Sequence, residues 1–180
     1  MTRDLWTIGH GTSTQADFLA TLHAADIDLI ADVRAHPGSR RNPQFSRDTM
    51  PTWLVDAGIA YRHLEALGGR RPRNPDVDPT TNGAWQNQSF HNYADYALTD
   101  DFTTGLAELR NLSDDHRVAV MCSESVPWRC HRLLISNAIV ARGDRVWHLI
   151  GDADPKPHAL GQWGATPVLH NDDTITYPAS

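Results

Sequence analysis

The sequence predicts a single α/β domain over residues 1–180, a Rossmann-like three-layer sandwich with a mainly parallel sheet of about five strands. Short apolar, β-prone runs alternate with segments of helical periodicity, which is typical of a parallel sheet with helices on both faces. Glycine, proline and capping residues separate the segments. Polar side chains follow several of the apolar runs, at the points where strands should end.

The composition is that of a soluble globular protein, with 40% hydrophobic and 21% charged residues. A net charge of -6 argues against nucleic-acid binding through a globally basic surface. With only two cysteines, a secreted disulfide framework is not expected. No run approaches a membrane span, and the N-terminus lacks an apolar signal core. We therefore expect a cytoplasmic protein without membrane contacts, and the sequence leaves its oligomeric state open.

Five apolar runs predict the strands of the sheet. They are residues 5–8, 27–33, 59–64, 118–121 and 145–150. Gly9 follows the first run directly and Gly151 follows the last, and such residues end strands. The strand order is not given by the sequence, so it stays open which strand ends lie side by side.

Five segments with helical periodicity predict the helices. They are residues 15–25, residues 46–57 or 48–57, and residues 90–98, 102–112 and 127–142. Ser13 or Thr14 caps the first helix and Thr99 caps the fourth, because short polar side chains accept hydrogen bonds from free amides at a helix start. Pro127 suits the first turn of the last helix, and Gly143 ends it.

Two segments lack regular periodicity. Residues 70–89 hold three prolines and belong to an irregular, lid-like insert at about 68–100. The tail, at about 152–180, is rich in proline, glycine and aspartate. It either packs over the sheet edge or remains mobile.

Reactive residues gather where the fourth strand ends. Cys122 and Glu124 follow the strand, and Arg129, His131 and Arg132 lie within the predicted start of the next helix. A thiol at a helix start with arginines nearby should have a lowered pKa, so Cys122 is a candidate nucleophile. The alternative is a small buried residue at the end of a core strand.

The second cysteine carries a weaker signal. Cys130 lies in helical register with an apolar stripe, which favours packing. Zinc held by Cys122, Cys130 and His131 is an alternative, but the usual C-x2-C pair is missing, so we predict no metal site and no required cofactor. Six residues separate Cys122 from Arg129, whereas the tyrosine-phosphatase signature has five between its cysteine and arginine. We therefore reject a tyrosine-phosphatase loop. His148, inside an apolar strand, is predicted to be a core histidine.

Other strand ends carry His10, Asp32 and Arg34, with Ser39 in the loop beyond. In this fold class the ends of parallel strands lie along one edge of the sheet. His10 stands between two glycines, which favours contact with a substrate. Asp32 and Glu124 are candidate general acid and base, or partners of arginines in structural ion pairs.

Arginine supplies nearly all the basic charge and concentrates near these loops. The arginines there are Arg34, Arg40, Arg41, Arg47, Arg129 and Arg132. Together with helix starts they predict a site for phosphate, carboxylate or a nucleic-acid backbone, with a solvated surface as the alternative. Trp85, Phe90 and Tyr93 either stack on a base or hold the insert against the body.

Several motifs stand together between residue 7 and about residue 150. They are Thr7-Ile8-Gly9-His10-Gly11, Asp32-Val33-Arg34 with Pro37 and Ser39, Phe45, Gly58-Ile59-Ala60-Tyr61 with Leu67-Gly68-Gly69, and Cys122-x-Glu124 followed by Cys130-His131-Arg132. In this combination the chain resembles the domain of unknown function 488 family. The resemblance implies one site but no particular reaction. That site would contain His10, Asp32, Arg34, Cys122, Glu124, His131 and Arg132.

Two functions follow as hypotheses. The first is an enzyme, a hydrolase or group transferase, that acts on a small anionic or nucleotide-like substrate. Its catalytic residues would be Cys122, Glu124, His10 and Asp32, and its substrate-binding residues Arg34, Ser39, Arg129, His131 and Arg132. The second is a non-catalytic module that binds nucleotides or nucleic acid, in which Cys122 is inert. A nicotinamide enzyme is disfavoured because Gly9-His10-Gly11 lacks the third glycine of the dinucleotide motif.

Overall fold

The computed structural model describes residues 2–179 and contains a six-stranded sheet with the order β3-β2-β4-β1-β5-β6. Its strands are β1 (Asp4–Gly9), β2 (Leu29–Asp32), β3 (Ala60–His63), β4 (Val118–Cys122), β5 (Arg145–Leu149) and β6 (Lys156–Pro157). The first five pair in parallel and β6 pairs antiparallel with β5. A separate hairpin joins β7 (Val168–Leu169) to β8 (Ile175–Thr176). The predicted Rossmann-like fold with a mainly parallel sheet is confirmed.

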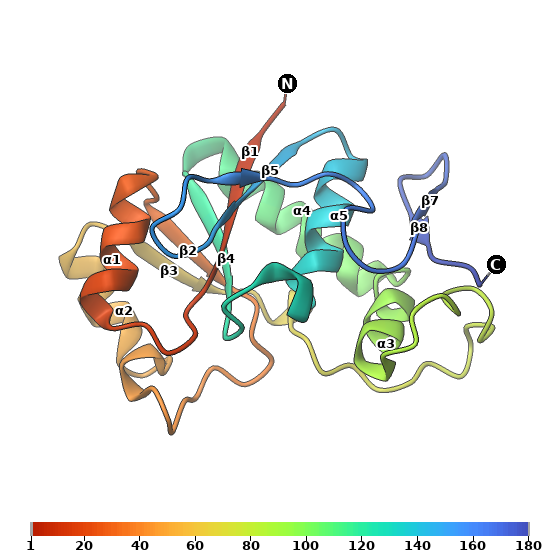
Figure 1. Cartoon of the computed structure of the whole chain (residues 1–180), viewed down its shortest axis with the longest axis horizontal. Coiled ribbons are helices and arrows are strands. Elements are labelled where there is room, and N and C mark those ends of the chain that lie inside the picture. The colour runs from red at the N-terminus through yellow and green to blue at the C-terminus, as the bar shows by residue number, and fades with distance from the viewer. Residues whose placement is uncertain (1, 180) are drawn as a thin grey trace.

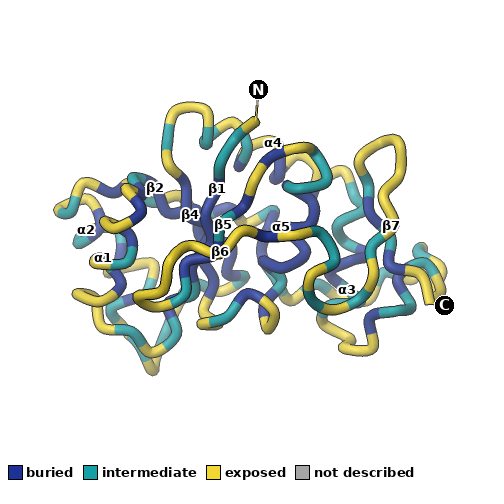
Figure 2. Tube along the Cα trace, turned by 45° about the horizontal axis from the view of Figure 1, so that its top comes forward, coloured by how far each residue is buried: buried dark blue, intermediate teal, exposed yellow. Residues whose placement is uncertain are grey.

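Helices cover both faces of the sheet (Figure 1). One face is covered by α1 (Gln15–Ala24) and α2 (Met50–Asp56), and the other by α3 (Gln88–Tyr96), α4 (Asp100–Asp115) and α5 (Arg132–Ala141). Side chains alternate along β4, so that Val120 joins the core beneath α4 and α5 while Met121 joins the core beneath α1 and α2. Figure 2 shows the buried residues concentrated along these central strands. Within residues 2–179, every helix is too short or too polar to cross a membrane.

The strand order brings three strand ends together. Strand β4 lies between β2 and β1, with Asp32 paired to Met121 and Gly9 paired to Cys122. The backbone pairing continues past the strands, because the His10 amide donates to the Cys122 carbonyl at 3.0 Å. The polar residues that follow these strands therefore lie at one edge of the sheet.

Local sequence signals account for several helix ends. The Thr14 hydroxyl accepts from the Asp17 amide at 3.1 Å, and the Thr99 hydroxyl accepts from the Phe102 amide at 3.3 Å. Both predicted caps are thus confirmed. Gly143 follows α5 with φ +91, a left-handed conformation that glycine adopts without steric cost, which confirms the predicted stop.

The predicted start of the last helix at Pro127 is wrong. Residues Pro127–Arg129 form only one 3-10 turn, Cys130 is extended with φ -138 and ψ 150, and α5 begins at Arg132. Proline fixes a helical φ but does not determine how long the helical segment continues. Cys130 therefore lies outside the helix, and its predicted helical register is also wrong.

The tail packs along the sheet edge and against α5. Strand β6 extends the sheet beside β5, and His158 and Tyr177 are buried. The Tyr177 amide donates to Asn82 Oδ1 at 2.9 Å, so the tail also fixes the irregular insert. Trp85 packs against the Tyr177 ring and is 7% exposed, which supports the interpretation that it holds the insert against the body.

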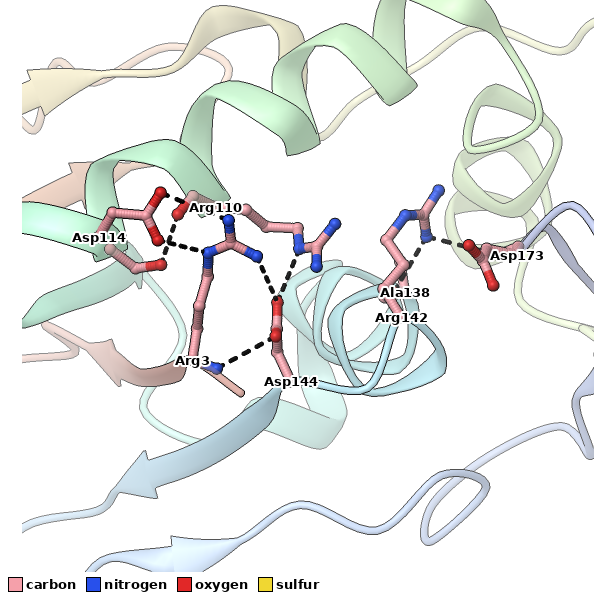
Figure 3. Close-up of polar contacts among 8 residues, drawn as sticks. Arg3, Arg110, Asp114, Ala138, Arg142, Asp144 and Asp173 are labelled. Atoms are coloured by element: carbon pink, nitrogen blue, oxygen red, sulfur yellow. Dashed lines mark hydrogen bonds and ion pairs between the residues drawn. The ribbon is translucent and has the colours of Figure 1, made fainter. Parts of the chain in front are cut away.

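At the amino ends of β1 and β5, Asp144 joins three elements (Figure 3). Its side chain is 2% exposed and accepts from Arg110 Nε on α4 at 2.7 Å. It also accepts from the backbone amide of Arg3, which precedes β1, at 3.2 Å. Through its guanidinium, Arg3 also pairs with an exposed carboxylate, that of Asp114, at 2.7 Å. Asp144 thus ties the start of β5 to β1 and α4.

Replacing Asp144 by alanine should lower the free energy of unfolding by about 2 kcal/mol, because a buried carboxylate with charged hydrogen-bond partners is lost. Asp114→Ala removes the exposed partner of the same arginine and should change the stability much less. Urea denaturation followed by circular dichroism measures both. Equal effects of the two substitutions would contradict this assignment.

Candidate functional site

A cleft of about 1270 Å³ opens at the edge where β1, β2 and β4 end. Of the nine residues predicted for the site, seven line it: His10, Arg34, Ser39, Cys122, Glu124, Arg129 and His131. The other two, Asp32 and Arg132, are buried and contact lining residues. The structure thus brings the predicted residues together.

The cleft is strongly basic although the chain is acidic overall. The arginines that line it are Arg34, Arg40, Arg41, Arg70 and Arg129. Within residues 2–179, Glu124 is the one carboxylate among the lining side chains. This separation of charge creates a local positive potential that attracts anions. Of the arginines predicted at the loops, Arg47 does not line the cleft.

Asp32 holds the guanidinium of Arg34 in place. Arg34 Nε donates to Asp32 Oδ1 at 2.9 Å and Nη2 donates to Oδ2 at 2.8 Å. The Arg34 amide and the Tyr61 hydroxyl also donate to this carboxylate. Asp32 is fully buried, so its geometry supports the ion-pair alternative: it fixes Arg34, which faces the cleft.

His10 lies beside Arg34 at the end of β1. Its Nδ1 is 2.8 Å from the Gly11 carbonyl oxygen, which can only accept, so Nδ1 carries the proton and Nε2 is an acceptor. Burial, together with the charge of Arg34, lowers the pKa of His10. The ring stacks on Phe45 with centroids 4.6 Å apart and is 3% exposed, more buried than its two flanking glycines suggest. His10 is therefore a neutral base at the cleft wall.

Cys122 forms part of the cleft floor together with Cys130. Burial raises the pKa of the Cys122 thiol, but hydrogen bonding from Cys130 and the charge of Arg132 outweigh this effect and lower it. Burial and the neighbouring Cys122 raise the pKa of Cys130 well above its usual value. The Cys122 Sγ also contacts the Glu124 carbonyl oxygen at 3.6 Å. Cys122 is therefore the thiol of the pair that ionises first.

Arg132 is 1% exposed and shares a backbone partner, the Glu124 carbonyl, with Cys122. Its Nη1 donates to Thr7 Oγ1 at 3.3 Å and its Nη2 donates to the Glu124 carbonyl at 3.0 Å. Among the described residues, its Nε finds no acceptor and no carboxylate lies within ion-pair distance. A buried cation requires compensation, and the thiolate of Cys122 can supply it.

His131 closes the floor on the other side of Cys130. Its Nε2 donates to the Val33 carbonyl at 2.7 Å, so Nδ1 is an acceptor, and it lies 3.4 Å from the Cys130 sulfur. Burial lowers the pKa of His131 to about 4. A Cβ atom at Gly69 would lie 2.9 Å from Nδ1, which explains a glycine at this position.

Cys130 and Arg70 are among the cleft residues that sequence reasoning did not predict for the site. Cys130 was assigned to the core, and it is buried, but it also lines the cleft beside Cys122. Its place in Cys130-His131-Arg132, among predicted site residues, was the available signal. Arg70 follows the third strand and Gly69, a position that pointed to the same edge. Within residues 2–179, no group of three or more histidine, cysteine and acidic side chains is arranged to hold a metal ion.

These features define a Rossmann-like α/β protein with a pair of thiols in an arginine-lined cleft. Residues 14–139 match the family described as Domain of unknown function DUF488, and the chain belongs to that family. The match confirms the resemblance, although it covers less than residues 7–150, so strands β1 and β5 and the tail lie outside the matched part. Comparisons with curated proteins and with solved structures gave no match.

Stability should fall as the pH decreases from 6.5 to 5. Burial lowers the pKa of His131 and His158 to about 4 and that of His148 to about 3, whereas unfolding restores values near 6.5. The unfolded chain therefore binds more protons in this range, and each histidine contributes about 1.4 kcal/mol per pH unit. Urea denaturation at several pH values should give a slope steeper than one histidine produces. His131→Gln should reduce the slope and the exposed His170→Gln should not; a flat profile would contradict the burial of these rings in neutral form.

Proposed function

We propose that this protein is a cysteine-dependent enzyme, a hydrolase or group transferase, that acts on a small anionic or nucleotide-like substrate. One observation carries the proposal: Cys122 lies in the cleft floor and contacts the same Glu124 carbonyl as the buried Arg132, whose hydrogen bonds go to neutral oxygens. Ionisation of Cys122 places an anion beside that cation. A thiolate at the base of a cleft is a nucleophile.

The arginines support binding of the anionic part of the substrate. Arg34 is fixed by Asp32 and leaves Nη1 facing His10, while Arg129 is exposed at the cleft wall. The planar guanidinium group matches the geometry of phosphate and carboxylate oxygens. A cleft of about 1270 Å³ has room for a nucleotide-sized molecule. Ser39 lines the same wall and adds a hydroxyl group.

The proposed chemistry divides between three side chains. The Cys122 thiolate bonds to the electrophilic centre of the substrate, and the leaving group departs with the bonding electrons. A water or alcohol then displaces the thiolate, giving hydrolysis or group transfer respectively. Its proton passes to His10 Nε2 or to the carboxylate of Glu124, which is exposed in the cleft. His10 Nε2 takes this proton when its lone pair is released by Arg34 Nη1, which lies 3.4 Å away.

We also infer a cytoplasmic location. Cys122 and Cys130 are both free although their thiols are in hydrogen-bonding contact. Such a pair stays reduced in the cytoplasm, where glutathione and thioredoxin systems operate.

Alkylation of the native protein between pH 5 and 10 tests the nucleophile. Iodoacetamide labelling, resolved by peptide mass spectrometry, should show a midpoint for Cys122 below the ordinary thiol value of about 8.5. Cys130 serves as the internal control and should react only at higher pH. A Cys122 midpoint near that of an ordinary thiol would reject the nucleophile and favour a non-catalytic nucleotide-binding or nucleic-acid-binding module.

A further inference from the structure

Buried hydrogen bonds connect Arg132 to the other side of β1. Arg132 Nη1 donates to Thr7 Oγ1 at 3.3 Å, and that hydroxyl lies 2.6 Å from His148 Nδ1. Arginine has donors only, so the Thr7 oxygen accepts from it, while the hydroxyl keeps a second lone pair and its own proton. The direction of the contact between Thr7 and His148 follows from the far end of the chain of hydrogen bonds.

The tail continues the same chain of hydrogen bonds. Asn137 Oδ1 on α5 can only accept, so His158 Nε2, 2.7 Å away, carries the proton of that ring and His158 Nδ1 is an acceptor. His148 Nε2 therefore donates to His158 Nδ1 at 2.9 Å, and the unprotonated His148 Nδ1 accepts from the Thr7 hydroxyl. The Asn137 amide donates to the Tyr177 hydroxyl at 3.0 Å, so the Asn137 end determines every proton position as far as Thr7.

The surroundings keep both rings neutral, as this arrangement requires. His148 is 0% exposed and His158 is 8% exposed. Burial lowers the pKa of His148 to about 3 and that of His158 to about 4. The Trp163 ring packs against both imidazoles, with centroids 5.5 and 6.0 Å away. The Thr7 hydroxyl uses its oxygen toward Arg132 and its proton toward His148, so the arrangement holds Thr7 in one orientation.

We infer that His148 and His158 are positioning residues of the cleft: acting through Thr7, they hold the Arg132 guanidinium beside Cys122. The tail, which supplies His158, is therefore part of the functional site. This inference rests on the proposed role of Cys122. It assigns a function to parts of the chain outside residues 14–139, since Thr7, His148 and His158 all lie beyond the family match.

The chain of hydrogen bonds acts on Cys122 through a single residue. The titratable and charged groups that influence Cys122 are Cys130, Arg132 and Glu124. Of these three, Arg132 is the one bonded to Thr7. When the chain of hydrogen bonds is broken, Nη1 loses its oriented acceptor, so the guanidinium keeps only the bond from Nη2 to the Glu124 carbonyl and is held less firmly beside the thiol. The thiolate is then stabilised less.

Substitution of His158 tests the coupling. In His158→Leu the Cys122 alkylation rate at pH 7 should fall about tenfold, because its midpoint moves up by about one pH unit. His170→Leu makes the same change at an exposed tail histidine and should keep the wild-type rate. Thr7→Val should behave like His158→Leu, and Thr7→Ser, which retains the hydroxyl, should keep the wild-type midpoint. A folded His158→Leu protein with the wild-type midpoint would overturn the inference.

A measurement on the wild-type protein applies even if the variants do not fold. Long-range ¹H–¹⁵N spectra distinguish the two tautomers of a neutral histidine. At pH 7 both His148 and His158 should carry the proton on Nε2, and a proton on His148 Nδ1 would overturn the inference. The proposed function fails separately, if wild-type Cys122 itself titrates as an ordinary thiol.

Discussion

The guanidinium of Arg132 is a buried cation at the junction of three elements, and much of the surrounding structure serves to hold it. Arg132 is the first residue of α5. Its guanidinium donates to Thr7 on β1 and to the Glu124 carbonyl in the loop after β4. Taking a cation out of water is costly, so each nearby group must offer an oxygen or a negative charge. Gly9 follows from the same constraint: a Cβ atom there would lie 1.5 Å from the Glu124 carbonyl oxygen. Only a glycine lets that carbonyl approach β1 and reach Arg132.

Two arginines near the cleft have opposite roles because their partners differ. Arg34 is neutralised by the carboxylate of Asp32 and is held rigidly at the cleft wall, with Nη1 facing His10. Arg132 bonds to neutral oxygens and shares the Glu124 carbonyl with Cys122, so its charge acts on the thiol. The first arrangement suits binding of an anion, and the second suits stabilisation of a thiolate. Both depend on the adjacency of β2, β4 and β1.

Signals that act over a few residues were predictable from the sequence. Thr14, Thr99 and Gly143 could be assigned because capping and left-handed turns depend on neighbouring residues alone. Polar residues at strand ends likewise indicated the residues that line the cleft. The start of α5 was not predictable, because Pro127 is equally compatible with a short 3-10 turn.

Features that depend on contacts between distant residues remained hidden. The strand order joins Asp32 to Met121, and no local pattern encodes such a pairing. His148 was correctly predicted to be buried, but its partner His158 lies in a tail whose composition suggested irregular structure. The proline and glycine content of that tail gave no indication that it completes a buried network.

The central claim is that three strand ends build one anion site with Cys122 at its base. The most direct test is a crystal structure of the protein with tungstate, a tetrahedral oxyanion that is located by its anomalous scattering. The account predicts tungstate in the cleft, bound by Arg34 and Arg129 and facing the Cys122 sulfur. Tungstate bound only elsewhere, or a cleft in which Cys122 and Arg34 face different surfaces, would contradict the account.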